Sequence, residues 1–301
     1  MDSFFATHVP DISRWGDLKV EPLTGSRSYL CKRLKISISS SSPNYSDVIH
    51  EIARAIASAR LRERELRLWE EAVLFSEDLS ATDQEIIARA LKRGICKSDS
   101  DWRLGVPLWN EEHFKGHLVE VLLFILQIFL SSSVGNTIHI FEPPRPKPMT
   151  ATGGIDLLEV GEYKGKYYFH VWECKGTDAD VRGAYSDAAR QLVSPGGTAY
   201  QAFMESHRSL QVTDTITSNS PLMDFIREMP KIFYGGTHSQ QQVGAVVASG
   251  LPITPTDSQG FARIVGSTVS SDYHHCQVMV IQIQDFPRFR KDVYQHLWNI
   301  Y

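Results

Sequence analysis

Two strand-like runs joined by a tight turn constrain this chain more than any other feature. The first runs from Ile155 to Glu162 and is rich in Ile, Leu and Val, and the second runs from Tyr167 to Lys175 and is rich in aromatic residues. Lys164 and Gly165 lie between them, and glycine tolerates the positive φ angle that a two-residue turn requires. The pattern predicts a β-hairpin in which paired residue numbers sum to 329.

This register brings acidic side chains together. Asp156 falls opposite Glu173, with Cβ atoms expected about 4.5–5.5 Å apart. Alternation along a strand puts Glu173 and Lys175 on one face, and Trp172 and Cys174 on the other. Two facing carboxylates repel, so a hard cation between them would remove a penalty. Mg²⁺ suits such a site because it takes oxygen ligands and keeps several waters.

These residues can be given roles in metal-assisted hydrolysis. Asp156 and Glu173 would hold the metal, with the main-chain carbonyl of Cys174 as a further ligand. Lys175 would orient the attacking water or help to deprotonate it, and would offset transition-state charge. The alternative is a chance pattern, because Glu-x-Lys is also common on solvent-facing strands. The aligned turn, the apolar strand before Glu173 and the neighbouring glycines favour the site.

An upstream apolar segment supplies another candidate acid. The pattern from Phe114 to about Leu130 predicts a helix that is apolar all round and therefore buried, and it is too short for a membrane span. Glu120 lies on it, and buried acids are rare unless they are paired. Two interpretations stay open: Glu120 belongs to the site, or it lies in the first turn, where the helix dipole favours an anion.

The order of these residues resembles the PD-(D/E)xK nuclease superfamily: a helix with Glu120 comes first, then Gly154-Ile155-Asp156, then Glu173-Cys174-Lys175. The resemblance covers roughly residues 110–200, and Ile155 stands where a proline usually precedes the acid. It implies an α-β-β-β-α-β core, Mg²⁺-dependent hydrolysis and catalytic roles for Glu120, Asp156, Glu173 and Lys175. The runs KGHLVEVLLFIL, GGID and WECKG are also similar to the nuclease subunits of Hachiman antiphage systems, which work beside a helicase.

A helix is predicted from Val181 to Leu192, with an aspartate cap before its start. Arg182 and Arg190 could face phosphate, and Gln191 lies where some superfamily members place a supporting polar residue. An ordinary amphipathic helix with solvated polar positions is the favoured alternative for these three residues. Two further strands, Gln242–Ala248 and Gln277–Ile283, are apolar enough for central positions in a covered sheet. A final helix, from about Asp285 to Tyr301, is expected to dock on that sheet.

The N-terminal third is expected to be mainly helical. It has a short strand at Leu34–Ile38, one long helix from Asp47 to about Phe75, and a second helix that starts at Thr82 and ends near Gly94. The predicted organisation is therefore a helical region over residues 1–109 and a nuclease-like core over residues 110–301. One continuous domain is the alternative.

Composition narrows the classes of protein. The chain has 301 residues with 31 basic and 35 acidic side chains, a net charge of −4, whereas a stand-alone DNA-binding domain is more often basic. This favours a local nucleic-acid contact, or delivery of the substrate by a partner. The first residues predict no signal peptide, and no apolar stretch reaches the length of a membrane span. Scattered Cys31, Cys96, Cys174 and Cys276 indicate a reducing cytoplasm.

The sequence thus predicts an α/β fold with a PD-(D/E)xK-type core, in which helices flank a central mixed β-sheet. The expected function is a Mg²⁺-dependent endonuclease, with Mn²⁺ as a substitute ion. DNA is the favoured nucleic acid, and the expected role is that of an effector in bacterial antiphage defence with a helicase or ATPase partner. Two alternatives remain: a restriction- or repair-type endonuclease that acts alone, and a non-catalytic scaffold of the same fold that serves a partner enzyme.

Overall fold

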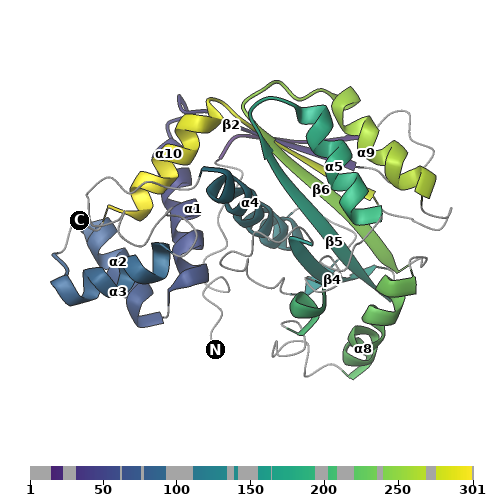
Figure 1. The fold of residues 1–301 in the computed structure, drawn as a ribbon, viewed down its shortest axis with the longest axis horizontal. Coiled ribbons are helices and arrows are strands. Elements are labelled where there is room, and N and C mark those ends of the chain that lie inside the picture. The colour runs from purple at the N-terminus through teal and green to yellow at the C-terminus, as the bar shows by residue number, and fades with distance from the viewer. Residues whose placement is uncertain are drawn as a thin grey trace.

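A mixed β-sheet covered by helices on both faces forms the molecule (Figure 1). The computed structural model describes residues 15–22, 32–61, 63–75, 78–92, 111–133, 139–141, 155–163, 165–193, 203–208, 220–235, 240–268 and 276–299. The strands are β1 (Asp17–Pro22), β2 (Lys32–Ile38), β3 (His139–Phe141), β4 (Leu157–Tyr163), β5 (Lys166–Thr177), β6 (Gln241–Ser249) and β7 (Cys276–Ile283). The helices are α1 (Tyr45–Arg60), α2 (Glu63–Phe75), α3 (Ala81–Lys92), α4 (Glu111–Ser133), α5 (Val181–Val193), α8 (Ser220–Gly235), α9 (Pro255–Thr268) and α10 (Phe286–Leu297). The predicted α/β class with a mixed central sheet is confirmed.

The strand order is β1-β2-β7-β6-β5-β4-β3. Strands β2, β7, β6 and β5 run parallel to their neighbours in this series, whereas β1, β4 and β3 pair antiparallel at the two sides. Parallel strands are stable where helices cover both faces, which requires apolar residues at successive positions. The runs in β6 and β7 meet this requirement, and the predicted central position of both strands is confirmed.

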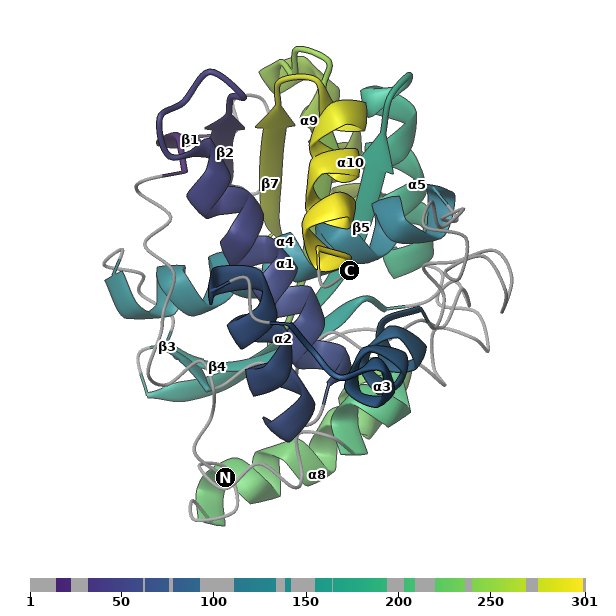
Figure 2. The ribbon, with the colours of Figure 1, turned by 90° about the vertical axis from the view of Figure 1, so that its left-hand side faces the viewer.

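Alternate residues of the central strands enter two separate cores. Val246 and Ala248 of β6 pack in a core with α1, α4 and α10, whereas Val243, Ala245 and Val247 pack with α5, α8 and α9. Figures 1 and 2 show these helix groups on opposite sides of the sheet. Successive side chains of a strand point to opposite faces, so one apolar run supplies both cores.

The region before residue 110 differs from its prediction in two helices. The long helix expected over Asp47–Phe75 is two helices, because Leu61 is extended (φ −95°, ψ 148°) and ends α1. Leu61 is buried, so packing of its side chain accompanies the break. Helix α3 starts at Ala81 rather than Thr82, since the Ser80 hydroxyl accepts a hydrogen bond from the Asp83 amide (3.1 Å).

The same N-terminal region contributes strands to the main sheet. The predicted strand at Leu34–Ile38 is confirmed as part of β2, which pairs with β7, and β1 extends the sheet beyond it. Trp69 of α2 donates its indole N–H to the Leu297 carbonyl of α10 (3.0 Å). The first and last parts of the chain therefore share one sheet and one core, and the boundary near residue 110 stays a prediction.

Helix α10 follows β7 through a left-handed residue. Asp285 (φ 54°, ψ 61°) caps the helix by accepting a hydrogen bond from the Arg288 amide, and Pro287 occupies the first turn. Phe286, Phe289 and Leu297 are fully buried against the sheet and its covering helices, which confirms the docking of the final helix. Among the described helices, none combines the length and apolar character of a membrane span.

Candidate functional site

The hairpin that carries the candidate site has the predicted register. Pairs run from Leu157–Trp172 to Tyr163–Lys166, and Gly165 has φ +73° at the turn. Positive φ is costly for residues with a Cβ atom, so glycine at this position specifies the turn. Lys164 and the glycines that precede Ile155 lie outside the described residues.

Asp156 lies at a bend one position beyond the last rung of this hairpin. Its amide donates to the Trp172 carbonyl (3.0 Å), and its carboxylate Oδ2 accepts from the Cys174 amide (2.6 Å). Asp156 is thus tied to the β5 backbone on both sides of Glu173, through its amide at Trp172 and through its side chain at Cys174. The predicted proximity of the two acids arises from this bend and not from a rung between them.

Glu173 and Lys175 lie on the opposite face of β5 from Trp172 and Cys174, as alternation predicts. Trp172 and Cys174 pack in the core with α4. Glu173 is 2% exposed, and its Oε1 accepts from Lys175 Nζ at 2.5 Å. The second oxygen, Oε2, is buried and has no hydrogen-bond partner among the described residues. A buried carboxylate oxygen without a donor is costly, which marks this atom as a position for a ligand.

Lys175 is held from two sides. Its Nζ donates to Glu173 Oε1 and to the Gln191 side-chain oxygen of α5 at 3.0 Å. Gln191 is therefore a member of this group, whereas the sequence favoured an ordinary surface position for it. Helical periodicity showed that Gln191 was exposed, but no local pattern could show that β5 runs beside it. Arg190 pairs with Asp187 on the outer surface of α5, and Arg182 is also exposed.

Glu120 approaches the group from the other layer. It lies in the middle of α4, which begins at Glu111, so the first-turn interpretation is wrong. Its carboxylate is 3.6 Å from His117 Nδ1, and its side chain is 26% exposed. The charge of Glu120 contributes to the raised pKa values of Asp156, Glu173 and Cys174, which indicates proximity to all three.

The acids of this group are electrostatically strained. Burial, followed by the charge of Glu120, raises the pKa of Asp156 to about 8, although the Cys174 amide and Lys175 oppose the shift. Burial and then the Asp156 charge raise the pKa of Glu173 well above its ordinary value. Burial also raises the pKa of the Cys174 thiol, so this side chain is a neutral thiol at pH 7. Like charges in a shielded place hold protons until a cation replaces them.

Lys175 responds in the opposite way. Burial pulls its pKa down, but the charge and hydrogen bond of Glu173, together with Asp156 and Cys174, outweigh burial and raise the pKa above its ordinary value. Lys175 is therefore a cation at neutral pH. This leaves orientation and charge compensation as the chemistry open to it in this state, because a protonated amine cannot accept a proton.

The residues fit a hard cation only in part. In the described part of the chain, no three His, Cys, Asp or Glu side chains form a metal-binding group. Asp156 and the unpaired Glu173 Oε2 supply two carboxylates, which is a usual number for Mg²⁺ with its retained waters. The carbonyl of Cys174 remains the predicted third ligand. The amide of the same residue donates a hydrogen bond to the Asp156 carboxylate.

Comparisons with known proteins leave this geometry without a family assignment. No protein-family model matches the chain, and no curated protein matches it. What the site does must therefore be inferred from its own residues.

Proposed function

We propose that the protein is a Mg²⁺-dependent nuclease that hydrolyses phosphodiester bonds at Asp156, Glu173 and Lys175. One observation carries the proposal: a buried carboxylate, Glu173, and a half-buried one, Asp156, both with raised pKa values, lie beside a lysine that is held in place from two elements. Such a combination is costly for folding and is typical of functional sites. An apolar pair in the same place would satisfy the core without that cost.

The chain's own residues divide the proposed work. Asp156 and Glu173 would bind the metal, with the Cys174 carbonyl beside them, and Glu120 would add negative charge from α4. When bound, the ion would polarise the phosphate and lower the pKa of a coordinated water. Lys175 would orient the attacking water and offset the charge that develops on phosphate. Gln191 would fix the Lys175 ammonium so that little reorganisation is needed.

Further details of this function rest on the resemblance to PD-(D/E)xK nucleases and on charge. DNA is the proposed substrate, and an antiphage role beside a helicase or ATPase, as in Hachiman systems, is the proposed setting. The net charge of −4 supports delivery of the nucleic acid by a partner, because phosphate is attracted to basic surfaces.

A cleavage assay tests the proposal. Wild type, Glu173→Gln and Lys175→Met would each be incubated with supercoiled plasmid, single-stranded DNA and RNA, in Mg²⁺, Mn²⁺ or EDTA. We expect metal-dependent cutting by wild type, and a loss of about 100-fold or more in each variant, the size usual for removing one transition-state donor. Adding candidate ATPase partners would test delivery.

Matched controls come from an exposed pair of the same residue types. Glu228 and Lys231 form an ion pair on the exposed surface of α8 (2.8 Å) and in this pair contact none of the site residues, so Glu228→Gln and Lys231→Met should leave cutting unchanged. Folding of every variant would be checked by circular dichroism. A folded Glu173→Gln protein that still cleaves at the wild-type rate would overturn the site. Wild type that binds no divalent ion and cuts nothing with any partner would favour a non-catalytic scaffold.

A further inference from the structure

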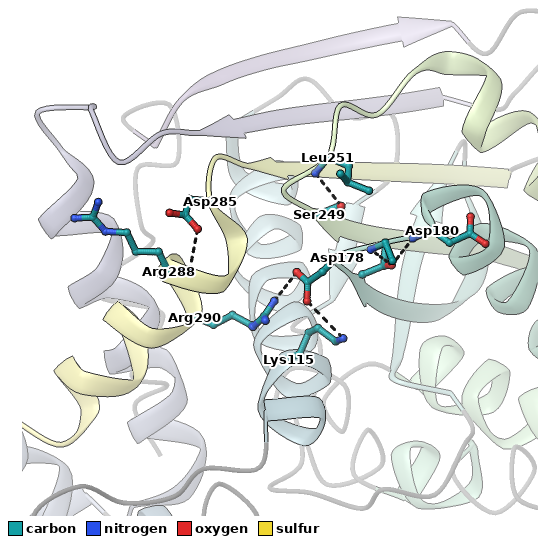
Figure 3. Close-up of polar contacts among 10 residues, drawn as sticks. Lys115, Asp178, Asp180, Ser249, Leu251, Asp285, Arg288 and Arg290 are labelled. Atoms are coloured by element: carbon teal, nitrogen blue, oxygen red, sulfur yellow. Dashed lines mark hydrogen bonds and ion pairs between the residues drawn. The ribbon is translucent and has the colours of Figure 1, made fainter.

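Three elements meet where β5 ends, a short distance beyond Lys175. Asp178 follows the last residue of β5, and its Oδ1 accepts a hydrogen bond from Arg290 Nη1 of α10 (2.9 Å). Its Oδ2 lies 3.9 Å from Lys115 Nζ of α4. Figure 3 shows the Lys115 and Arg290 side chains converging on Asp178 from their two helices. One carboxylate therefore links both helices to the strand that carries Glu173 and Lys175.

Separating the Arg290 side chain from Asp178 would cost free energy. Its side chain is 5% exposed and lies over the Phe286 ring, with 4.6 Å between the guanidinium carbon and the ring centroid. Its Nε has no hydrogen-bond partner among the described residues. A buried cation is stable only with a counter-ion, and removing one member of such a pair leaves an uncompensated charge. Asp178 is thus required to keep α10 seated at this end of β5.

Helix α4 touches β5 directly between Lys175 and Asp178. A Cβ atom added to Gly176 would lie 2.5 Å from Lys115 Cγ and 3.3 Å from a Val119 methyl group. The absence of a side chain at Gly176 lets the Lys115 stem cross the strand on its way to Asp178. Glu120 follows Lys115 on the same helix by little more than one turn. The contact that fixes Lys115 therefore also fixes how far Glu120 stands from the β5 acids.

We infer that Lys115, Asp178 and Arg290 are positioning residues that set Glu120 of α4 against the two acids of the site, Asp156 and Glu173. The inference rests on the proposed function, because Glu120 matters only if the group binds a cation. A charge acts on a neighbouring group in inverse proportion to distance, so a small shift of α4 changes what Glu120 contributes. The three residues act through Glu120 and do not touch the reacting atoms.

A double-mutant cycle tests this role with Mn²⁺ as the probe. Mn²⁺ affinity would be measured by electron paramagnetic resonance for wild type, Asp178→Asn, Glu120→Gln and the double variant. Plasmid cleavage by the same four proteins would be measured in parallel. We expect each single change to weaken Mn²⁺ binding by about 10- to 100-fold, as changes around metal ligands do. The double variant should bind no more weakly than the weaker single variant, because residues that act through one another are not additive.

Two further variants separate positioning from stability. Asp224→Asn breaks an exposed ion pair of α8 and should leave Mn²⁺ affinity unchanged. Asp178→Leu with Arg290→Met removes both the buried cation and its partly exposed counter-ion, and replacing both members of such a pair often preserves folding. This variant should keep the thermal midpoint of wild type and still bind Mn²⁺ weakly. Full Mn²⁺ affinity in it would show that the pair serves folding alone, and would overturn the inference.

The outcomes also separate this inference from the proposed function. Wild type that binds Mn²⁺ and cleaves, with additive penalties in the cycle, would overturn the positioning role and leave the nuclease intact. Wild type that neither binds Mn²⁺ nor cleaves would overturn the nuclease, and the positioning role with it.

Discussion

Asp156 and Glu173 carry the largest electrostatic cost at the scale of single residues. Glu173 is buried and Asp156 is half-buried, both carry the influence of the Glu120 charge, and each holds its proton more tightly than a free carboxyl group does. Lys175 relieves part of the repulsion through Glu173 Oε1. The repulsion that Lys175 does not relieve predicts how the stability of the protein depends on pH and on divalent ions.

In EDTA, the contribution of Asp156 to the free energy of unfolding of the wild type should fall as the pH rises from about 4 to about 8. The folded pKa of Asp156, about 8, lies above its ordinary value of 3.8, so the folded state binds the extra proton between these values and loses this advantage as the proton leaves. Mg²⁺ should restore stability at pH 8 more than at pH 5. Urea unfolding at several pH values would measure both effects.

Asp156→Asn cannot titrate and should flatten that pH dependence. Asp187→Asn, on the exposed side of α5, is the matched control and should leave the slope as in the wild type. A wild-type slope retained in Asp156→Asn would contradict the assignment of the raised pKa to this residue.

Gly244 gives a second prediction at this scale. A Cβ atom there would sit inside contact distance of the Trp172 ring, which is fully buried and donates its N–H to Glu159 (3.0 Å). The ring has no free space to move into, so Gly244→Ala should destabilise by about 1–3 kcal/mol through overpacking. Chemical denaturation would measure the loss.

Gly116→Ala is the matched control for this substitution. No atom lies within 4 Å of a Cβ added to Gly116 in α4, and alanine in a helix is favoured over glycine by about 0.5–1 kcal/mol. This variant should therefore gain stability. Equal effects of the two substitutions would show that contact with Trp172 does not determine the stability change in Gly244→Ala.

At the scale of elements, helices α1 and α10 are joined by a pair of histidines. His50 Nδ1 and His296 Nε2 lie 3.0 Å apart, and the His50 ring stacks on Trp69 of α2. One ring must donate and the other accept, so the contact needs neutral imidazole in at least one of them. Burial lowers both pKa values, that of His296 to about 4, and the charge of Arg54 adds to the shift of His50.

This pair predicts acid sensitivity of the α1–α10 contact. The folded pKa of His296 lies below the ordinary 6.5, so its stabilising contribution is present above pH 6.5 and is lost as the pH falls toward 4. His296→Gln should reduce the loss of unfolding free energy between pH 7.5 and pH 5. An unchanged loss in His296→Gln and in His50→Gln would place the acid sensitivity elsewhere.

The whole molecule depends on contacts between its two ends. Strand β2 covers one side of β7, and α1 packs in one core with α10 and α4 (Figure 2). Without the first 109 residues, β7 would present an unpaired edge and α10 would lose its α1 neighbour. The region after residue 109 therefore loses two of its packing partners, β2 and α1, when it is separated from the first 109 residues.

A fragment of residues 110–301 should fail to form a cooperative fold, although it contains every residue of the candidate site. Near-ultraviolet circular dichroism and urea unfolding of the fragment would check this, with the full chain as the control. Co-expression of residues 1–109 should restore the native spectrum. Cooperative unfolding of the fragment alone would establish an independent domain from residue 110 onward.

Features that depend on near neighbours in the chain could be predicted from the sequence. Alternating and apolar runs located β4 to β7, the Gly165 turn set the hairpin register, and Asp180 marked the start of α5, where it accepts a hydrogen bond from the Gly183 amide (2.8 Å). These features follow from backbone sterics and side-chain alternation, which act over a few residues. Counting residues across the turn placed Asp156 near Glu173, although the bend at Asp156 brings them together in place of a rung.

The remaining features of the fold and of the site depend on tertiary packing. The break at Leu61 divides a continuous helical pattern, because helix propensity does not encode where a buried leucine must pack. The contact of Gln191 with Lys175 and the link from Lys115 through Asp178 to Arg290 join residues that are distant in the sequence. Such contacts depend on how helices and strands stack, which local patterns do not specify. The carboxylates could be located from the sequence, but the residues that hold them in place could not.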